Sequence, residues 1–123
     1  MAVPYRILAV DNEPSVAVSL KYAFARPRYE VSSAESGPAA LAMLAAHSDP
    51  YDLIIVDQKM PNLTGVELVD EIRKRGIPGD IIVLSAQVLP EIREAYERLN
   101  VQAIFSKPFD LEELRSAVEH LAD

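Results

Sequence analysis

One stretch of the sequence decides the fold: YDLIIVDQKMP, which runs from Tyr51 to Pro61. Its centre, Leu53 to Val56, is four apolar residues in a row, three of them β-branched. Such a run, bounded by polar residues and a proline, predicts a strand buried on both faces of a parallel sheet. Asp57 follows directly, at the edge of an open α/β sheet where ligands bind. Its carboxylate must be paired, metal-bound or reactive, because a buried charge left alone is costly.

Length and composition predict a single domain over residues 1–123, with half of its residues hydrophobic and a quarter charged. The formal net charge of −7 argues against direct contact with nucleic acid, since such surfaces are basic. The absence of cysteine excludes disulfides and thiolate metal sites. No apolar run approaches the roughly 20 residues that cross a bilayer, and the N-terminal residues lack the apolar core of a signal peptide. We therefore expect a cytoplasmic protein without membrane contact.

Apolar patterns predict five strands that alternate with five helices. The strands are expected at Tyr5 to Val10, Tyr29 to Ala34, Leu53 to Val56, Asp80 to Leu84, and Ala103 to Ser106. The helices are expected to start at Pro14, Ser36-Gly37-Pro38, Thr64, Pro90 and Asp110, whose spacing from Glu113 is that of a capping box. This alternation predicts a parallel sheet with helices on both faces, because parallel strands need crossover connections.

Each predicted helix carries one apolar stripe that is expected to face the sheet. The stripes are Val16, Leu20, Ala23 and Phe24; Leu41, Leu44 and Ala45; Leu68, Val69 and Ile72; Ile92, Ala95, Tyr96 and Leu99; and Leu111, Leu114, Val118 and Leu121. His47 and His120 lie at predicted helix ends without the spacing of metal ligands, so both are expected on the surface.

Polar side chains gather where the predicted strands end. Asp11 follows the first strand, Asp57 the third and Lys107 the fifth, while Ser85 ends the fourth. The carboxyl ends of parallel strands meet at one edge, so these residues are expected to be neighbours. Together with the amide of Asn12, they suit a hard metal ion and a phosphoryl group. Mg²⁺ binds carboxylates and phosphate oxygens, Lys neutralises phosphate, and Asp can accept a phosphoryl group covalently.

These motifs, in this order, resemble the receiver domain of bacterial two-component response regulators. The matching segments are Ile7 to Pro14, Tyr51 to Pro61 with Gly65, Ile82 to Ala86, and Lys107 to Phe109, within a resemblance from about Arg6 to His120. The resemblance implies a flavodoxin-like, three-layer α/β fold with strand order 2-1-3-4-5. It also implies a signalling domain that catalyses only its own phosphotransfer and dephosphorylation, and is not otherwise an enzyme.

The resemblance assigns roles residue by residue. It implies a phosphoacceptor at Asp57, phosphoryl contacts from Ser85 and Lys107, and a Mg²⁺ or Mn²⁺ site made by Asp11, Asn12, Asp57 and the backbone carbonyl of Lys59. The Lys107-Pro108 bond is often cis in the family. A histidine kinase or phosphotransfer protein is the expected phosphoryl donor. The fourth helix, fifth strand and fifth helix form the face where a partner or a second copy of the chain is expected.

Asn12 departs from the family pattern, because it replaces the second acid of the usual metal-binding pair. Its carbonyl oxygen is still a ligand for Mg²⁺, but one negative charge is missing, so we expect weaker affinity. The alternative is a phosphorylation-independent pseudo-receiver that acts as a protein-interaction module.

Ile104 is a second departure, since the family commonly places Tyr or Phe three residues before the lysine and uses it to report the switch. Phe105 is expected to point to the opposite face of its strand, so it is no obvious substitute. Lys59 and Gln87 occupy positions whose side chains tune phosphoryl lifetime in the family.

Three further hypotheses are weaker. A flavin-binding module needs a phosphate loop after the first strand, where Asp11 and Glu13 would repel a phosphate. A haloacid-dehalogenase-like phosphatase needs an acid two residues after its nucleophile, where this chain has Lys59. A purely structural, capping role for Asp57 does not account for the convergence of Asp11 and Lys107.

Overall fold

Strand β3, Leu53–Asp57, is the centre of a five-stranded sheet in the structure, a computed structural model that describes residues 3–46, 50–60 and 63–123. The other strands are β1 (Tyr5–Val10), β2 (Tyr29–Ala34), β4 (Asp80–Ser85) and β5 (Ala103–Ser106). Their order is β2-β1-β3-β4-β5, and every neighbouring pair is parallel. The predicted strand order 2-1-3-4-5 is confirmed.

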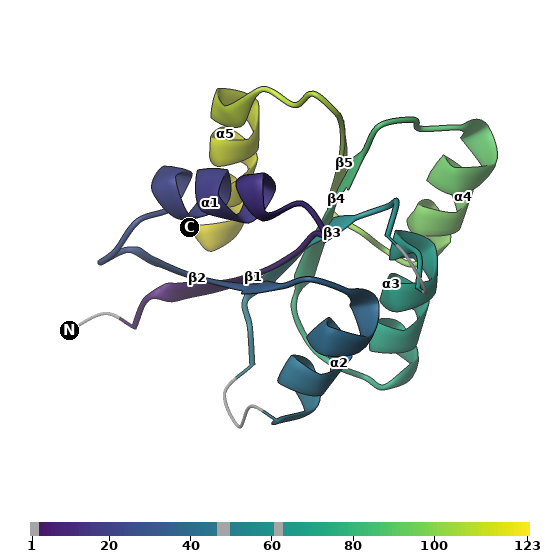
Figure 1. The fold of residues 1–123 in the computed structure, drawn as a ribbon, viewed down its shortest axis with the longest axis horizontal. Helices are drawn as coiled ribbons and strands as arrows, with labels where there is room; N and C mark the ends of the chain where they lie inside the picture. Colours follow the sequence, from purple (N-terminus) through teal and green to yellow (C-terminus); the bar gives the residue numbers. More distant parts are fainter. Residues whose placement is uncertain (1–2, 47–49, 61–62) are drawn as a thin grey trace.

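The helices of the described segments cover both faces of this sheet. They are α1 (Pro14–Ala23), α2 (Gly37–Ala46), α3 (Gly65–Lys74), α4 (Pro90–Arg98) and α5 (Leu111–Ala122). Figure 1 shows α1 and α5 on one side of the sheet and α2, α3 and α4 on the other. The three-layer α/β architecture is confirmed. Among the described residues, no helix is long and apolar enough to span a membrane.

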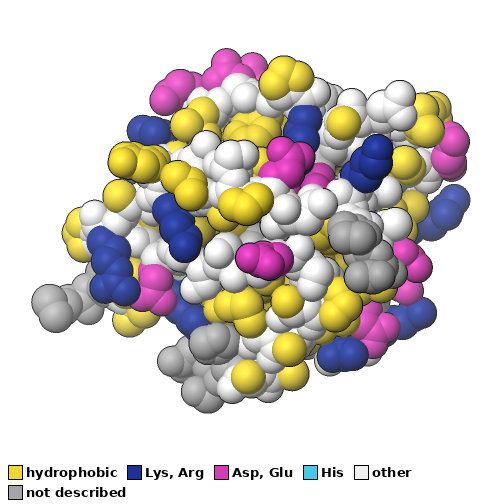
Figure 2. All heavy atoms as spheres, in the orientation of Figure 1, with side chains coloured by type: hydrophobic (Ala, Val, Ile, Leu, Met, Phe, Trp, Pro, Cys, Tyr) yellow, Lys and Arg dark blue, Asp and Glu magenta, His cyan; other side chains and the backbone are white. Residues whose placement is uncertain are grey.

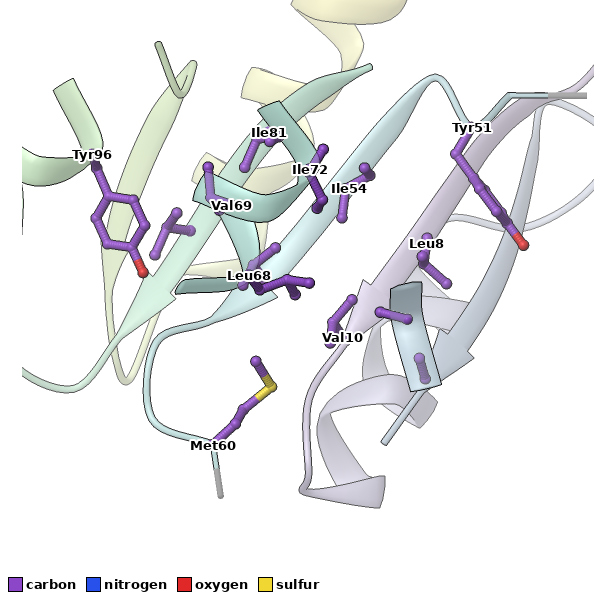
Figure 3. Close-up of a cluster of buried hydrophobic side chains, with 14 residues drawn as sticks. Leu8, Val10, Tyr51, Ile54, Met60, Leu68, Val69, Ile72, Ile81 and Tyr96 are labelled. Carbon is purple, nitrogen blue, oxygen red and sulfur yellow. The ribbon is translucent and has the colours of Figure 1, made fainter. Parts of the chain in front are cut away.

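Successive residues of β3 pack into different apolar clusters, because side chains alternate between the two faces of a strand. Ile54 and Val56 lie in the cluster shown in Figure 3, together with Leu68, Val69 and Ile72 of α3 and with Tyr96 of α4. Leu53 and Ile55 lie in a second cluster on the other face of the sheet. This cluster also contains Leu20 and Phe24, at α1 and its C-terminal end, and Leu114 and Val118 of α5. The four apolar residues of β3 are therefore all buried, as predicted.

Polar groups hold the amino end of β3 in place. Asp52 precedes the strand, and its Oδ2 accepts a hydrogen bond from the backbone N–H of Arg6 at 2.8 Å. The backbone N–H of Asp52 donates in turn to the carbonyl of Arg6 at 2.8 Å. These two bonds fix the start of β3 against β1.

Local sequence signals explain where the helices begin. Thr64 and Glu67 form a capping box at α3, in which each side chain accepts a hydrogen bond from the backbone N–H of the other. Asp110 caps α5 by accepting from the backbone N–H of Glu112 and Glu113. Pro14 and Pro90 occupy first-turn positions, where a missing N–H costs nothing.

The structure departs from the predictions in small ways. Strands β3 and β4 each run one residue further than predicted, because pairing continues through Asp57 and Ser85. The prediction that Ala45 faces inward is wrong: it is exposed, and Ala40 is fully buried instead. Because α2 is apolar on all sides, periodicity does not select its inner face. The predicted end of this helix near His47 lies outside the described residues.

Two tyrosines give the fold an expected sensitivity to alkaline pH. The hydroxyls of Tyr5 and Tyr29 are buried and have no hydrogen-bond partner among the described residues. Burial, followed by the nearby carboxylates of Asp80 and Asp52, raises the pKa of Tyr5 from 10.0 to about 12. Burial is also the main cause that raises the pKa of Tyr29.

We expect the free energy of unfolding to fall as the pH rises from 10 toward 12. Below the unfolded pKa of 10.0 both the folded and the unfolded chain keep the Tyr5 proton, so titration of Tyr5 does not lower the free energy of unfolding. Above it, the unfolded chain loses this proton while the folded chain keeps it until about 12, which favours unfolding. Urea unfolding at a series of pH values checks this, and Tyr5→Phe should show a shallower fall. An identical fall in both proteins would contradict the assignment.

Candidate functional site

The candidate site lies at the carboxyl ends of β1, β3, β4 and β5. Register pairs Val10 with Val56 and Asp57 with Leu84, so Asp11 and Asp57 leave the sheet at the same level. Ser85 pairs with Ser106, which places Lys107 directly beyond the last rung. The sheet thus brings together all four strand-end residues that the sequence indicated.

A single ammonium group joins the two buried carboxylates. Nζ of Lys107 lies 3.2 Å from Oδ2 of Asp11 and 3.2 Å from Oδ1 of Asp57. Asp11 is 6% exposed and Asp57 3% exposed. Oε1 of Glu13, which is more exposed, lies 3.9 Å from the same Nζ. The two buried carboxylates share one partly buried cation, so the inner part of the site has an excess of negative charge.

The charges of this cluster perturb one another. Burial, followed by the negative charge of Asp11, raises the pKa of Asp57, while the hydrogen bond and charge of Lys107 and a backbone hydrogen bond from Lys59 oppose the rise. For Lys107, burial lowers the pKa, but the two carboxylates outweigh burial and the net shift is upward. The ammonium therefore stays protonated, and the Asp57 carboxylate is destabilised relative to water.

The loop after β1 holds Asp11 and presents Asn12. Oδ1 of Asp11 accepts a hydrogen bond from the backbone N–H of Glu13 at 2.8 Å, which leaves Oδ2 for Lys107. Asn12 is exposed and lines a pocket at the site. The other lining residues are Glu13, Asp57, Lys59, Met60, Ala86 and Lys107. Three of the four predicted metal-ligand residues, Asn12, Asp57 and Lys59, therefore line this pocket, and Asp11 contacts the Lys107 that also lines it.

Ser85 reaches the site, but its hydroxyl is directed elsewhere. The residue is 2% exposed, and Oγ donates to the backbone carbonyl of Gln87 at 2.6 Å. The backbone carbonyl of Ser85 accepts from the N–H of Lys107 at 2.7 Å, which ties the two strand ends together. A direct contact between Ser85 and a phosphoryl group stays a prediction.

Three other expectations from the sequence are confirmed. The Lys107-Pro108 peptide bond is cis. Ile104 packs against the cluster of α2, α3 and α4, whereas Phe105 packs against the opposite cluster, so Phe105 does not replace the missing aromatic residue. His120 is exposed, as expected, and His47 lies outside the described residues.

Sequence reasoning missed Gln58, which directly follows Asp57 but is not among the residues that line the pocket. Its backbone N–H donates to the carbonyl of Leu84 at 2.9 Å, and its own carbonyl accepts from Gly65 N–H at 2.9 Å. Its side-chain Oε1 accepts from the backbone N–H of Val66 at 3.2 Å and from the hydroxyl of Tyr96. A polar residue directly after Asp57 was the available signal, but nothing in the sequence pairs it with Tyr96.

Comparison with known proteins settles the family. Residues 7–119 match the family described as the response regulator receiver domain. The chain belongs to this family. The response regulator MprA of Mycolicibacterium vanbaalenii is 35% identical over 118 residues, which are 96% of this chain and 50% of that protein. MprA of Mycobacterium leprae is 35% identical over 116 residues, which are 94% of this chain and 50% of that protein.

This receiver domain spans about half the length of those curated relatives. Solved structures of similar length agree with its fold. The chemotaxis protein CheY4 of Vibrio cholerae has a TM-score of 0.85 and 28% identity, covering 96% of this chain and 98% of that chain. The receiver domain of the Francisella response regulator 1452 has a TM-score of 0.84 and 28% identity, covering 95% of each chain. The chain is thus a receiver domain of two-component signalling.

Proposed function

We propose that this receiver domain accepts a phosphoryl group on Asp57 from a phosphohistidine of a kinase or phosphotransfer protein. The observation that carries the proposal is the buried Asp57 carboxylate, which lies 3.2 Å from the Lys107 ammonium at the open end of the central strand. A carboxylate oxygen attacks phosphorus, the phosphorus–nitrogen bond breaks, and the imidazole leaves with its electron pair. The product is an acyl phosphate, a recognised covalent intermediate of aspartate.

Lys107 has two tasks in this scheme. Before the transfer it offsets the charges of Asp11 and Asp57, which lets two carboxylates share a buried edge. After the transfer its ammonium is close enough to neutralise a phosphoryl oxygen on Asp57. Ser85 would assist once its hydroxyl turns away from the carbonyl of Gln87.

The donor set fits a divalent cation. Two buried carboxylates with one ammonium leave negative charge uncompensated, and burial, followed by the charge of Asp11, raises the pKa of Asp57. Among the described residues, no three acidic or histidine side chains form a complete metal site. The ligands of Mg²⁺ or Mn²⁺ would be Asp11, Asp57, the oxygen of Asn12, the backbone carbonyl of Lys59, water and phosphoryl oxygens. A bound cation would shield the incoming phosphoryl group from the carboxylates.

Asn12→Asp is expected to raise the affinity for Mg²⁺ on the order of tenfold. A negative charge near a dication is worth a few kcal/mol at an effective dielectric near 20, before hydration offsets most of it. Calorimetric titration with magnesium chloride measures the change. Asn100→Asp is the matched control, because Asn100 is exposed and lines a different pocket, away from Asp57. Equal affinities for the parent and Asn12→Asp would refute the role of Asn12.

The proposal is tested by incubating the protein with acetyl phosphate and magnesium, and measuring intact mass. We expect the gain of one acid-labile phosphoryl group, and no gain when EDTA removes the metal. A phosphorylated histidine phosphotransfer protein should donate as well. A chain that binds partners but takes no phosphoryl group from either donor would instead be a pseudo-receiver.

The face made by α4, β5 and α5 is the proposed surface for a partner or a second copy. Helix α4 presents charged, exposed side chains there, including Glu91, Glu94 and Arg98, and Leu89 before it is 43% exposed. Light scattering before and after phosphorylation measures any change in mass. Figure 2 shows cationic and anionic side chains interspersed on the face it views. The expectation that this domain does not contact nucleic acid directly rests on its net charge of −7. The expected location is the cytoplasm.

A further inference from the structure

Helix α4 packs on the domain through Tyr96, with Ile92 partly buried against the same apolar cluster. Tyr96 is the helix's one fully buried residue among those described, with 0% exposure, while most of its neighbours on α4 are exposed. Figure 3 shows the Tyr96 ring reaching from α4 into the apolar cluster that contains Leu68 and Val69 of α3. A change in the surroundings of Tyr96 would therefore reach α4 directly.

The Tyr96 hydroxyl ends on the residue that follows the phosphoacceptor. It donates a hydrogen bond to Oε1 of Gln58, and burial raises the pKa of Tyr96, with a further rise from the charge of Asp57. The hydroxyl therefore keeps its proton and acts as a donor. Other hydrogen bonds join Gln58 to Leu84 of β4 and to Gly65 and Val66 at the start of α3. Movement of Asp57 cannot leave Gln58 unaffected.

Gly65 makes room for this contact. A Cβ atom on Gly65 would collide with the Tyr96 hydroxyl and would lie 2.8 Å from the Cα of Gln58 and 2.9 Å from its Oε1. Only a residue without a side chain lets α3, Gln58 and Tyr96 approach so closely. Gln58, Gly65 and Tyr96, from three separate segments of the chain, thus pack together around this hydrogen bond.

We propose that the hydrogen bond between Tyr96 and Gln58 couples the state of Asp57 to the position of α4, and that Tyr96 is a positioning residue of the switch. This coupling rests on the proposed phosphorylation of Asp57. A phosphoryl group adds charge and volume beside Gln58, so the loop after β3 must shift. The shift strains or breaks a bond that α4 provides, and α4 responds. The aliphatic side chain at Ile104 leaves this role open for a different aromatic residue.

The test compares the parent with Tyr96→Phe, Gln58→Leu and the double variant. The matched control is Tyr29→Phe, which removes a buried hydroxyl that has no hydrogen-bond partner among the described residues. Intact mass after acetyl phosphate and magnesium reports modification of Asp57. Amide hydrogen exchange over residues 90–98, with and without magnesium and beryllium fluoride as a phosphoryl mimic, reports the response of α4. Circular dichroism and urea unfolding confirm that each variant is folded.

We expect the parent and Tyr29→Phe to show the same change in α4 exchange when the mimic binds. Tyr96→Phe and Gln58→Leu should each lose more than half of that change while still accepting one phosphoryl group. The double variant should lose no more than a single variant, because the two groups act through one bond. A double variant that loses clearly more than either single variant, a full response in Tyr96→Phe, or a parent α4 that does not respond would overturn the coupling. A parent that takes no phosphoryl group would overturn the proposed function, and the coupling with it.

Discussion

Asp57→Asn is expected to abolish phosphoryl transfer from acetyl phosphate and, in buffer without divalent cations, to raise the free energy of unfolding. The amide cannot form an acyl phosphate, so labelling should be lost completely. The gain in stability follows from the environment of the carboxylate. Burial and the charge of Asp11 raise the pKa of Asp57 above 3.8 despite its contact with Lys107. The ionised form is thus less favourable in the folded chain than in the unfolded one.

The sign of this effect follows from linkage. Because the folded pKa is raised, stability is complete at pH values below the unfolded pKa of 3.8 and falls as the pH rises through the folded value. At neutral pH the free energy of unfolding of the parent is therefore lowered by the ionised Asp57, whereas that of the asparagine variant is not. Lys107 keeps its other partner, Asp11, at 3.2 Å.

Mass spectrometry and urea unfolding measure the two outcomes on the same samples. Asp80→Asn is the matched control, because Asp80 lies at the amino end of β4 and the site lies at the carboxyl ends of the strands. It should label like the parent. Magnesium should stabilise the parent, by about 1.4 kcal/mol at ten times its dissociation constant, and should stabilise Asp57→Asn less. Labelling that survives in Asp57→Asn would show that the phosphoacceptor is another residue.

Lys107→Ala is expected to destabilise the fold by on the order of 3 kcal/mol, the usual consequence of removing one partner of a buried ion pair. Without the ammonium, the negative charges of Asp11 and Asp57 repel each other with little screening by solvent, since the two residues are only 6% and 3% exposed. Phosphoryl transfer should also slow, because nothing then neutralises the phosphoryl oxygens from this side.

Urea unfolding compares this variant with Lys74→Ala, which removes an exposed ion pair to Asp70 on α3. The control should change stability little, because exposed pairs contribute little. Magnesium should restore more stability to Lys107→Ala than to the parent, since a dication can replace the missing positive charge. A loss no larger than that of the control would show that the buried carboxylates do not depend on Lys107.

Local patterns in the sequence predicted the strands and the residues at their ends, whereas the strand order was implied by the resemblance to receiver domains. Apolar runs mark buried strands, and parallel pairing then forces Asp11, Asp57, Ser85 and Lys107 to one edge. Such patterns do not predict the directions in which polar side chains point. The bond from Ser85 to Gln87 and the bond from Tyr96 to Gln58 depend on loop conformation and on packing between distant segments. Ala45 was misplaced because a helix that is apolar on all sides has no periodic signal.

The burial of β3 on both faces has a consequence for its alignment. In a strand with one solvent-exposed face, a shift of the pairing register by one residue would expose the apolar side chains, which is energetically unfavourable. Leu53 to Val56 are apolar on both faces, so a slipped strand would still fill both cores. Its alignment is instead set by its charged ends, with Asp52 bonded to Arg6 at one end and Asp57 to Lys107 at the other. Asp57 thus contributes to the alignment of the central strand through Lys107, and this role is distinct from overall stability, which its buried charge lowers at neutral pH.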